Sequence, residues 1–581
     1  MKFWRGYSTV ILVAVSVPSF TCNTKFDRYP DLYEATIQDL QSGLDANEYS
    51  SVDLVTAYLA RIDEVNTQGA NLRAVLETNR HALEQAAALD LERRTKGKRS
   101  PLHGIPILLK DNIATLATEG THRGSIQIES ELRVAFIFAS KGMNTTAGSY
   151  ALLGSVVPSD STVSAKLRSA GAILLGKTGM SEWAYARDWN LPSGWSGRSG
   201  QITNPYFPGA DPCGSSSGSG VATAIGLAAG SLGTETVGSI ICPSSYNNLV
   251  GIKPTVGLTS RAGVIPISSH YDTVGPMTRN VADAAVILSV IAGRDHKDNY
   301  TLAAPANTPD YTRFLNPDAI RGKRFGVPRK VFTNDTLTGS HPIINVELGR
   351  ALETIRSLGG IVVDPADLPS ANSALKNEQN LVLNIDLKVD LGRYLQTLRY
   401  TPTKVASLAD VIGYNTQYKD LESPNGEGQS FFIDSQSTKG YNSSYYSVLR
   451  SSYEAGRQQG IDYALEHYDL DALVLPTLAQ VIASLAGYPM LTVPLGFYPD
   501  DTPVTPHPPH LPSPAPGLPF GLAFLGTAFS EPELIGFAYA YEQHTRTRLK
   551  RRAYPLAIPT TQLQDIVGVS LKQNDPSNPD P

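Results

Sequence analysis

Two serines lie in small-residue loops at the ends of one short segment, and this spacing suits nucleophilic catalysis. Residues 212–254 read PCGSSSGSGVATAIGLAAGSLGTETVGSIICPSSYNNLVGIKP, with Ser216 in the first loop and Ser239 in the second. The residues between the loops predict one short helix and one strand, which would bring the two serines close together. Gly-rich turns leave consecutive backbone N–H groups free to face a developing negative charge, so GTETVGS is typical of an oxyanion hole. A flexible linker has a similar composition to GSSSGSG, but the small-residue helix that follows favours a packed loop.

A lysine ends an apolar run upstream of these loops. Lys110 closes GIPILLK, which predicts a buried strand. A buried lysine is unfavourable unless its amine is paired or neutral, and the alternative is a side chain that reaches solvent. Together with two loop serines, Lys110 is a candidate general base.

These residues resemble the amidase signature family, and the resemblance extends over residues 31–550. The motifs that carry it follow the family's order: GIPILLKDN, MNTTAGS, AGAILLGKTGMSEWA, GSSSGSG, GTETVGSIICP, GIKPTVGLTSR, AGYPMLTVPLG and LAFLGTAFSEPEL. Several motifs in order are far more specific than any one alone. The cysteine-bearing forms PCGSSSGS and ICPSS are most similar to the fungal branch.

The resemblance implies an α/β fold, with a large mixed β-sheet covered by helices on both faces. It also implies a Ser-Ser-Lys triad that hydrolyses the C–N bond of a small-molecule amide through an acyl-enzyme, without metal or cofactor. Ser239 would be the nucleophile and Lys110 the terminal base. The family's first loop usually reads GGSSGG, so the bridging serine is Ser215 or Ser216, and we assign Ser216. The implied oxyanion donors are the backbone N–H groups of Thr236, Val237, Gly238 and Ser239.

The sequence departs from the family pattern at two places. Val237 stands where the family commonly has Gly or Asp. Residues 116–140 are an atypical insertion beside the candidate lysine, and their stretch RVAFIFAS is apolar and strand-like, which is unusual for an exposed loop. We interpret them as a translated intron rather than a lid. A genuine insertion would favour a gated or inactive homologue, although the lysine and both serines are present.

Composition indicates a globular chain and excludes some partners. The chain has 581 residues, 41% of them hydrophobic, and a net charge of -5 without a basic cluster. This argues against a nucleic-acid or anionic-membrane partner. Apolar positions at helical spacing predict helices within 31–66 and 81–94. Residues 284–480 are more helical and polar, and in the family such a region shapes the acyl pocket.

The N-terminal sequence predicts secretion, and the C-terminal sequence predicts a disordered tail. Residues 1–22 read as a signal peptide, because Lys2 and Arg5 precede an apolar run too short to span a membrane. A disordered N-terminal tail is the alternative. Glycosylation sequons begin at Asn299, Asn334 and Asn442, whereas the sequon at Asn144 lies in a family motif and is not expected to carry a glycan. We also expect a proline-rich exposed loop at 498–518 and a disordered tail at 570–581.

Three cysteines are too few for a disulfide scaffold. Cys22 would leave with the signal peptide, and Cys213 and Cys242 flank the two serine loops. They are either within disulfide reach or two buried free thiols.

Other motifs name competing classes of protein. GAILLGKT, from Gly171 to Thr178, matches a phosphate loop, but its variable positions belong in a strand. GSSSG fits the nucleophile elbow of α/β-hydrolase esterases, which would make Ser216 the attacker and require His467 or His544. SALK, from Ser373 to Lys376, matches a β-lactamase motif without its companions. An amidotransferase subunit is a further alternative, and the secretory N-terminus argues against it.

Overall fold

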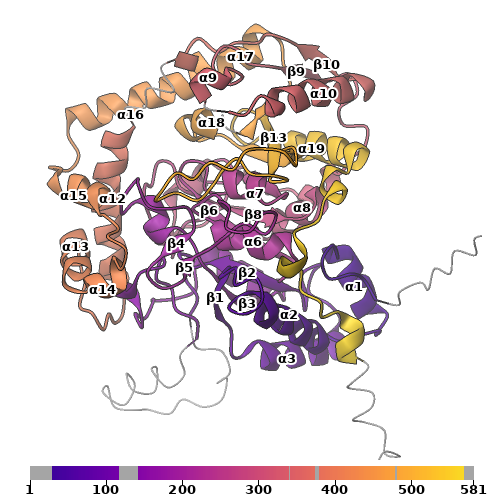
Figure 1. The fold of residues 1–581 in the computed structure, drawn as a ribbon, viewed down its shortest axis with the longest axis vertical. Coiled ribbons are helices and arrows are strands. Elements are labelled where there is room, and N and C mark those ends of the chain that lie inside the picture. The colour runs from indigo at the N-terminus through magenta and orange to yellow at the C-terminus, as the bar shows by residue number, and fades with distance from the viewer. Residues whose placement is uncertain (1–28, 117–141, 339, 373–378, 478–479, 568–581) are drawn as a thin grey trace, which may run out of the picture.

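The structure is a computed structural model that describes residues 29–116, 142–338, 340–372, 379–477 and 480–567. Within these residues eleven strands form one mixed sheet in the order β1-β3-β2-β6-β8-β7-β12-β13-β11-β9-β10 (Figure 1). Their bounds are β1 Val75–Thr78, β2 Pro106–Lys110, β3 Ile173–Thr178, β6 Gly230–Glu235, β7 Val250–Lys253, β8 Thr273–Thr278, β9 Arg324–Gly326, β10 Ile361–Val363, β11 Ala472–Pro476, β12 Met490–Phe497 and β13 Pro519–Leu525. A separate two-stranded sheet pairs β4 Trp195–Ser196 with β5 Gly200–Gln201.

The centre of the large sheet is covered on both faces. Every residue of β2, β3, β6 and β8 is buried. Because successive side chains point to opposite faces of a sheet, complete burial requires cover on both faces. The expected α/β fold with a mixed sheet is therefore confirmed.

The predicted N-terminal helices are present. The segment 31–66 contains α1 Ile37–Asp45 and α2 Ser51–Val65, and α3 Ala82–Lys96 follows. Capping boxes begin the first two helices, with Thr36 and Asp39 in α1 and Ser50 and Asp53 in α2. Such reciprocal side-chain bonds satisfy the free N–H groups of the first turn and fix where each helix starts.

The remaining helices surround the sheet and build a lateral lobe. The lobe of α12 to α16, drawn in orange on the left of Figure 1, packs Phe431 and Phe432 in one cluster with Trp183. The longer helices are α5 Thr162–Ser169, α6 Ser217–Ala224, α7 Ile241–Tyr246, α8 Val281–Ile291, α10 Ile343–Ser357, α12 Asn380–Thr397, α13 Leu408–Gln417, α15 Ser430–Ser437, α16 Ser443–Gly456, α17 Asp462–His467, α18 Gln480–Ala486 and α19 Glu531–Thr545; two short ones are α9 Asp335–Thr338 and α14 Lys419–Glu422.

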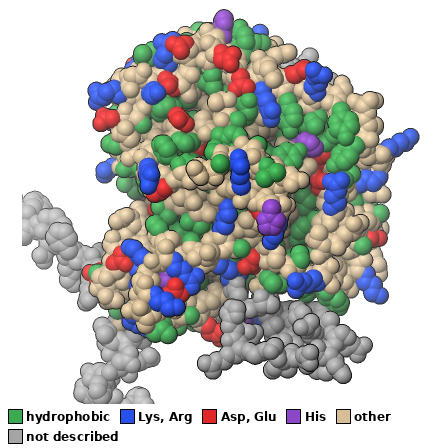
Figure 2. Space-filling model, turned by 180° about the vertical axis from the view of Figure 1, so that it is seen from behind, with side chains coloured by type: hydrophobic (Ala, Val, Ile, Leu, Met, Phe, Trp, Pro, Cys, Tyr) green, Lys and Arg blue, Asp and Glu red, His purple; other side chains and the backbone are tan. Residues whose placement is uncertain are grey.

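Several sequence predictions fall outside the described residues: the signal peptide, almost all of 116–140, the SALK motif and the C-terminal tail. The phosphate-loop match does not form a loop, because Ile173–Thr178 is strand β3. The predicted exposed loop 498–518 is exposed at residues 500–501 and 503–510, whereas Tyr498, Thr502, Ala515 and Leu518 are buried. In the described part of the chain no helix is long and apolar enough to cross a membrane. On the face seen in Figure 2, acidic and basic side chains are interspersed.

Candidate active site

Lys110 is the last residue of β2 and lies at the edge of the sheet where the parallel strands β2, β3 and β6 all end. Its side chain is fully buried and does not reach solvent. The Nζ atom donates to Ser215 Oγ at 2.8 Å and to the backbone oxygen of Thr234 at 3.1 Å. Lys110 is therefore held against the first serine loop. The sequence analysis predicted that the lysine and this loop lie together.

Burial makes Lys110 a usable base. Desolvation lowers its pKa from 10.5 to about 7, although the carboxylates of Glu235 and Asp272 oppose the shift. The charged ammonium is disfavoured in a low-dielectric interior, whereas the neutral amine is not. A substantial fraction of Lys110 is consequently neutral near pH 7.

A lysine base with this lowered pKa implies a defined pH dependence for the amide hydrolysis that the family resemblance predicts. Only the neutral amine of Lys110 can accept a proton. The value of kcat/KM should therefore rise about tenfold per pH unit below the pKa and level off above about pH 7. Initial rates of ammonia release from about pH 5 to pH 9 measure this profile. A rate that falls through neutral pH would contradict a neutral-lysine base.

The structure places Ser215, and not the predicted Ser216, against Lys110. Ser216 Oγ instead donates to the backbone oxygen of Thr234 at 3.2 Å and accepts from the Thr234 N–H at 3.3 Å. Ser216 immediately precedes α6, so its side chain ties the start of that helix to β6. The assignment of Ser216 as the bridge is therefore corrected. The sequence has three consecutive serines at 215–217, and nothing in it indicates which of them contacts the lysine.

Ser239 lies in the turn between β6 and α7. The carboxylate of Glu235 accepts from the N–H groups of Ile240 at 2.7 Å and Ile241 at 3.0 Å, which fixes the turn to the start of α7. Gly238 has a φ of 76°, a left-handed conformation that glycine adopts without strain. Within the described residues the N–H groups of the four predicted donors, 236–239, donate to no acceptor, as oxyanion donors require.

Residues that the sequence did not single out hold this turn. Thr236 Oγ1 donates to Asp272 at 2.6 Å, and Asn112 donates to the Thr234 hydroxyl at 3.0 Å. Asn112 and Glu235 belong to the motifs KDN and GTETVGS, so position within a motif was the available signal. Asp272 immediately precedes β8, and only the pairing of β8 with β6 brings it here.

Ser215 and Ser239 line one small cavity of about 10 Å³, whose further lining includes Thr236, Arg261, Ile265 and Ile267. Ser239 is 6% exposed, whereas Ser215 is fully buried. The cavity brings together a buried lysine–serine pair and a slightly exposed second serine. Such a site can generate an alkoxide at Ser239 and stabilise the oxyanion that its attack produces.

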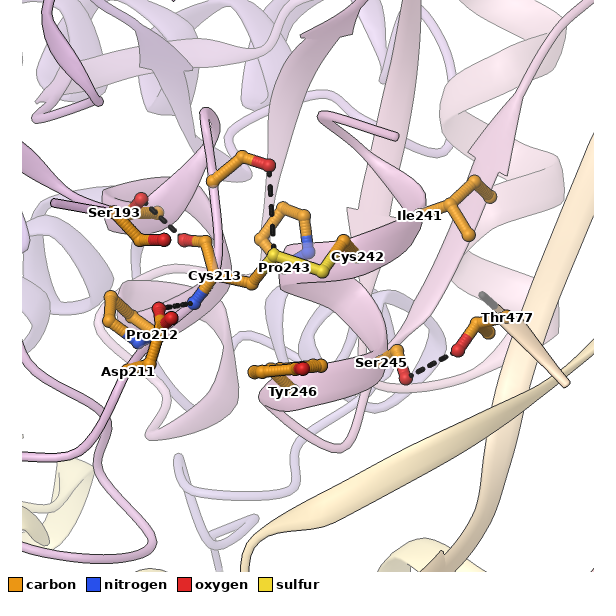
Figure 3. Close-up of a disulfide and its surroundings, with 12 residues drawn as sticks. Ser193, Asp211, Pro212, Cys213, Ile241, Cys242, Pro243, Ser245, Tyr246 and Thr477 are labelled. Atoms are coloured by element: carbon orange, nitrogen blue, oxygen red, sulfur yellow. Dashed lines mark hydrogen bonds between the residues drawn. A yellow bond between two sulfur atoms is a disulfide. The ribbon is translucent and has the colours of Figure 1, made fainter. Parts of the chain in front are cut away.

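A disulfide joins the two serine loops. Cys213, two residues before Ser215, is bonded to Cys242, three residues after Ser239 (Figure 3). The N–H of Cys213 also donates to Asp211 Oδ1 at 2.7 Å. Of the two states left open by the sequence, the structure contains the disulfide.

Removing the disulfide should destabilise the protein. It closes a loop with a sequence separation of 29, and opening a loop of that length costs about 3 kcal/mol of unfolding free energy through chain entropy. We expect the double variant Cys213→Ala, Cys242→Ala to show this loss in urea unfolding, and reduced wild-type protein should match it. Equal stability of the oxidised and reduced protein would contradict the expectation.

The esterase alternative finds no support in the geometry. Ser216 Oγ is bonded to the Thr234 backbone, and His467 packs against Tyr463 and Tyr468 on and just after α17. The nucleophile elbow requires a histidine at the serine hydroxyl. Lys110 occupies the equivalent place at Ser215.

Comparisons with known proteins identify the class. A sequence model of the Amidase family matches residues 53–132 and 138–480, and the break falls inside the insertion at 116–140. A putative amidase of Arthroderma benhamiae is 40% identical, with 90% of this chain and 88% of the relative covered. The solved native peptide amidase from Stenotrophomonas maltophilia is 40% identical, with 91% of this chain and 99% of that chain covered and a TM-score of 0.77. A peptide amidase solved with the competitive inhibitor chymostatin is 41% identical, with coverages of 90% and 99% and the same TM-score of 0.77.

The fold and the comparisons together define a hydrolase that acts on linear amides. The chain belongs to the amidase signature family.

Proposed function

We propose that Ser239, Ser215 and Lys110 form the catalytic triad of an amidase that works through an acyl-enzyme on Ser239. The contact between Lys110 Nζ and Ser215 Oγ, beside the cavity that Ser239 also lines, carries the proposal. It connects a base to a bridging hydroxyl, and the shared cavity brings that hydroxyl into the same site as the slightly exposed Ser239.

Acylation moves one proton along this chain. Ser239 Oγ attacks the amide carbonyl carbon and gives its proton to Ser215, while Ser215 gives its own proton to neutral Lys110. The N–H groups of 236–239 stabilise the resulting oxyanion. When the C–N bond breaks, Ser215 protonates the leaving nitrogen and regains a proton from Lys110. The products of this half-reaction are the Ser239 ester and ammonia or an amine.

Deacylation uses the same groups in the same order. A water molecule loses its proton to Ser215, which again passes a proton to Lys110, and the hydroxide attacks the ester. The C–O bond to Ser239 then breaks, and the proton returns through Ser215 to the Ser239 oxygen. The free acid leaves and the triad is restored.

We further propose a peptide carboxamide as the substrate class. The similarity to solved peptide amidases at 40–41% identity over nearly their whole length supports this choice.

Secretion, with residues 1–22 removed as a signal peptide, is part of the proposal. The sequon residues Asn299, Asn334 and Asn442 are all exposed, as acceptors of glycans must be. Asn144 is partly buried and donates to Glu77, which agrees with its exclusion as a glycan site. A disulfide is also typical of proteins that fold in an oxidising compartment.

Ammonia release from peptide amides, aliphatic amides and aryl amides tests the function. The panel is run on the chain from residue 23, on the same chain without residues 116–140, and on Ser239→Ala. We expect the fastest release from peptide amides and none above background from Ser239→Ala. Equal rates across the panel would reject the substrate class, and loss of activity on deleting 116–140 would reject the intron interpretation.

A further inference from the structure

A second and much larger cavity lies beside the catalytic one. It has a volume of about 500 Å³, within the range of small-molecule sites. Its lining includes Arg457, Tyr453, Tyr488, Tyr300, His270 and Phe529. We call this cavity the aromatic cleft.

The aromatic cleft and the catalytic cavity belong to the same edge of the sheet. Glu235, at the end of β6, pairs with Thr273 at the start of β8. Lys253, at the end of β7, pairs with Met490 at the start of β12, and Tyr488 of the cleft lies two residues before that strand. The guanidinium of Arg261, which lines the catalytic cavity, lies 4.5 Å from the ring centre of Tyr300, which lines the cleft.

The fold places Arg457 in the cleft by a close approach of two helices. Arg457 directly follows α16, and its Nε donates to the backbone oxygen of Ala486 at the end of α18, at 2.8 Å. A Cβ at Gly456 would lie 2.4 Å from the Ala486 nitrogen, so only glycine permits this approach. The guanidinium rests over the ring of Tyr453 at 4.0 Å and lies 5.4 Å from that of Tyr488.

No acidic side chain in the described part of the chain pairs with Arg457. Among the described residues no carboxylate lies within salt-bridge distance of Arg457, and its two Nη atoms donate no hydrogen bond. The nearby cation Arg261 differs, because Asp298 pairs with it at 2.7 Å. The nearby Asp462 accepts from Tyr488 at 2.7 Å and from Thr527 at 2.8 Å, and His270 faces Asp386 at 2.9 Å.

From this geometry we infer that the aromatic cleft is a binding site for a carboxylate carried on an aromatic or apolar body. A planar guanidinium with free N–H groups matches a carboxylate in two parallel hydrogen bonds. The stacked Tyr453 holds that fork in one orientation, and the surrounding rings offer apolar and edge contacts to the rest of the ligand. The acid can be part of a substrate or product, or a separate effector.

Calorimetry on the full mature chain with Ser239→Ala tests the site without any turnover. The probes are N-acetyl-L-phenylalanine, which carries a carboxylate, and the neutral N-acetyl-L-phenylalaninamide. We expect the acid to bind, and Arg457→Gln to weaken it at least about tenfold, since a charge-assisted pair contributes roughly this much. The amide should bind more weakly and should not respond to that substitution.

Arg450→Gln is the matched control, because Arg450 lies on α16, the helix that Arg457 directly follows. Its side chain is 82% exposed, so the substitution should leave the affinity unchanged. Arg457→Lys keeps the charge without the fork and should give an intermediate affinity. If Arg457→Gln fails to fold, its Tm will be lowered. In that case the affinity of Arg457→Lys for the acid decides whether Arg457 binds the carboxylate. The proposal would be overturned if the acid bound Ser239→Ala with the same affinity whether or not Arg457 had also been replaced. It would also be overturned if the acid did not bind at all.

Inhibition of the active protein by N-acetyl-L-phenylalanine identifies the source of the ligand. A rise in KM alone indicates that the cleft holds the body of the substrate, and a change in kcat indicates a separate effector. Arg457→Gln should abolish either effect. Because binding is measured on Ser239→Ala, a failure of the catalytic assignment leaves this test intact.

Discussion

Replacing Ser239 with alanine is expected to lower kcat for amide hydrolysis by at least about 10⁴-fold, because it removes the proposed nucleophile from the oxyanion turn at the cavity. The residual rate would come from substrate positioning and the oxyanion donors. KM should change little, since the hydroxyl acts mainly in the transition state. Steady-state ammonia release measures both parameters.

Ser244→Ala is the matched control for that experiment. Ser244 is also buried, lies on α7 five residues further along, and its hydroxyl has no hydrogen-bond partner among the described residues. Its removal should leave kcat within about threefold of wild type. Comparable losses in the two variants would show that Ser239 acts through the fold rather than as the nucleophile.

The second large effect should separate two adjacent serines. We expect Ser215→Ala to lower kcat about 10³-fold, because it removes the hydroxyl that Lys110 contacts and so breaks the proton path. Ser216→Ala removes two contacts to the Thr234 backbone and should cost about 1–3 kcal/mol of stability, with kcat within about tenfold of wild type.

The pH profile distinguishes a catalytic defect from a structural one, because a structural defect lowers the rate without changing the shape of the profile. In Ser216→Ala the rise of kcat/KM through about pH 7 should remain, because Lys110 and Ser215 are intact. In Ser215→Ala the residual rate should lose this dependence. The opposite pattern, with Ser216→Ala the more damaged and flat in pH, would restore the original assignment.

The arrangement in the structure differs from the sequence prediction at one position, because Lys110 contacts Ser215 rather than Ser216. The apolar run before Lys110 and the glycine turn around Ser239 predicted a buried base and an oxyanion turn, because burial and backbone conformation leave marks in composition. The composition of the loop does not distinguish Ser215 from Ser216. The choice between them depends on which hydroxyl faces β2 just before α6 begins, and that is a property of the folded loop.

Contacts between distant segments were beyond the sequence for the same reason. The disulfide remained one of two possibilities until β6 and α6 brought Cys213 and Cys242 together. Arg457 carries no motif, and its importance arises only where α16 meets the end of α18 at Gly456. The expectation that residues 284–480 contain further helices, by contrast, followed directly from their pattern.

Covalent labelling with a fluorophosphonate tests the central claim most directly, because the reagent modifies the activated serine of a hydrolase. After reduction and digestion, fragmentation spectra of the peptide that contains all three candidate serines locate the added mass. We expect the label on Ser239, and we expect it to be lost in Ser215→Ala but not in Ser216→Ala. A label on Ser216 would contradict this expectation and would favour the nucleophile elbow of an α/β-hydrolase.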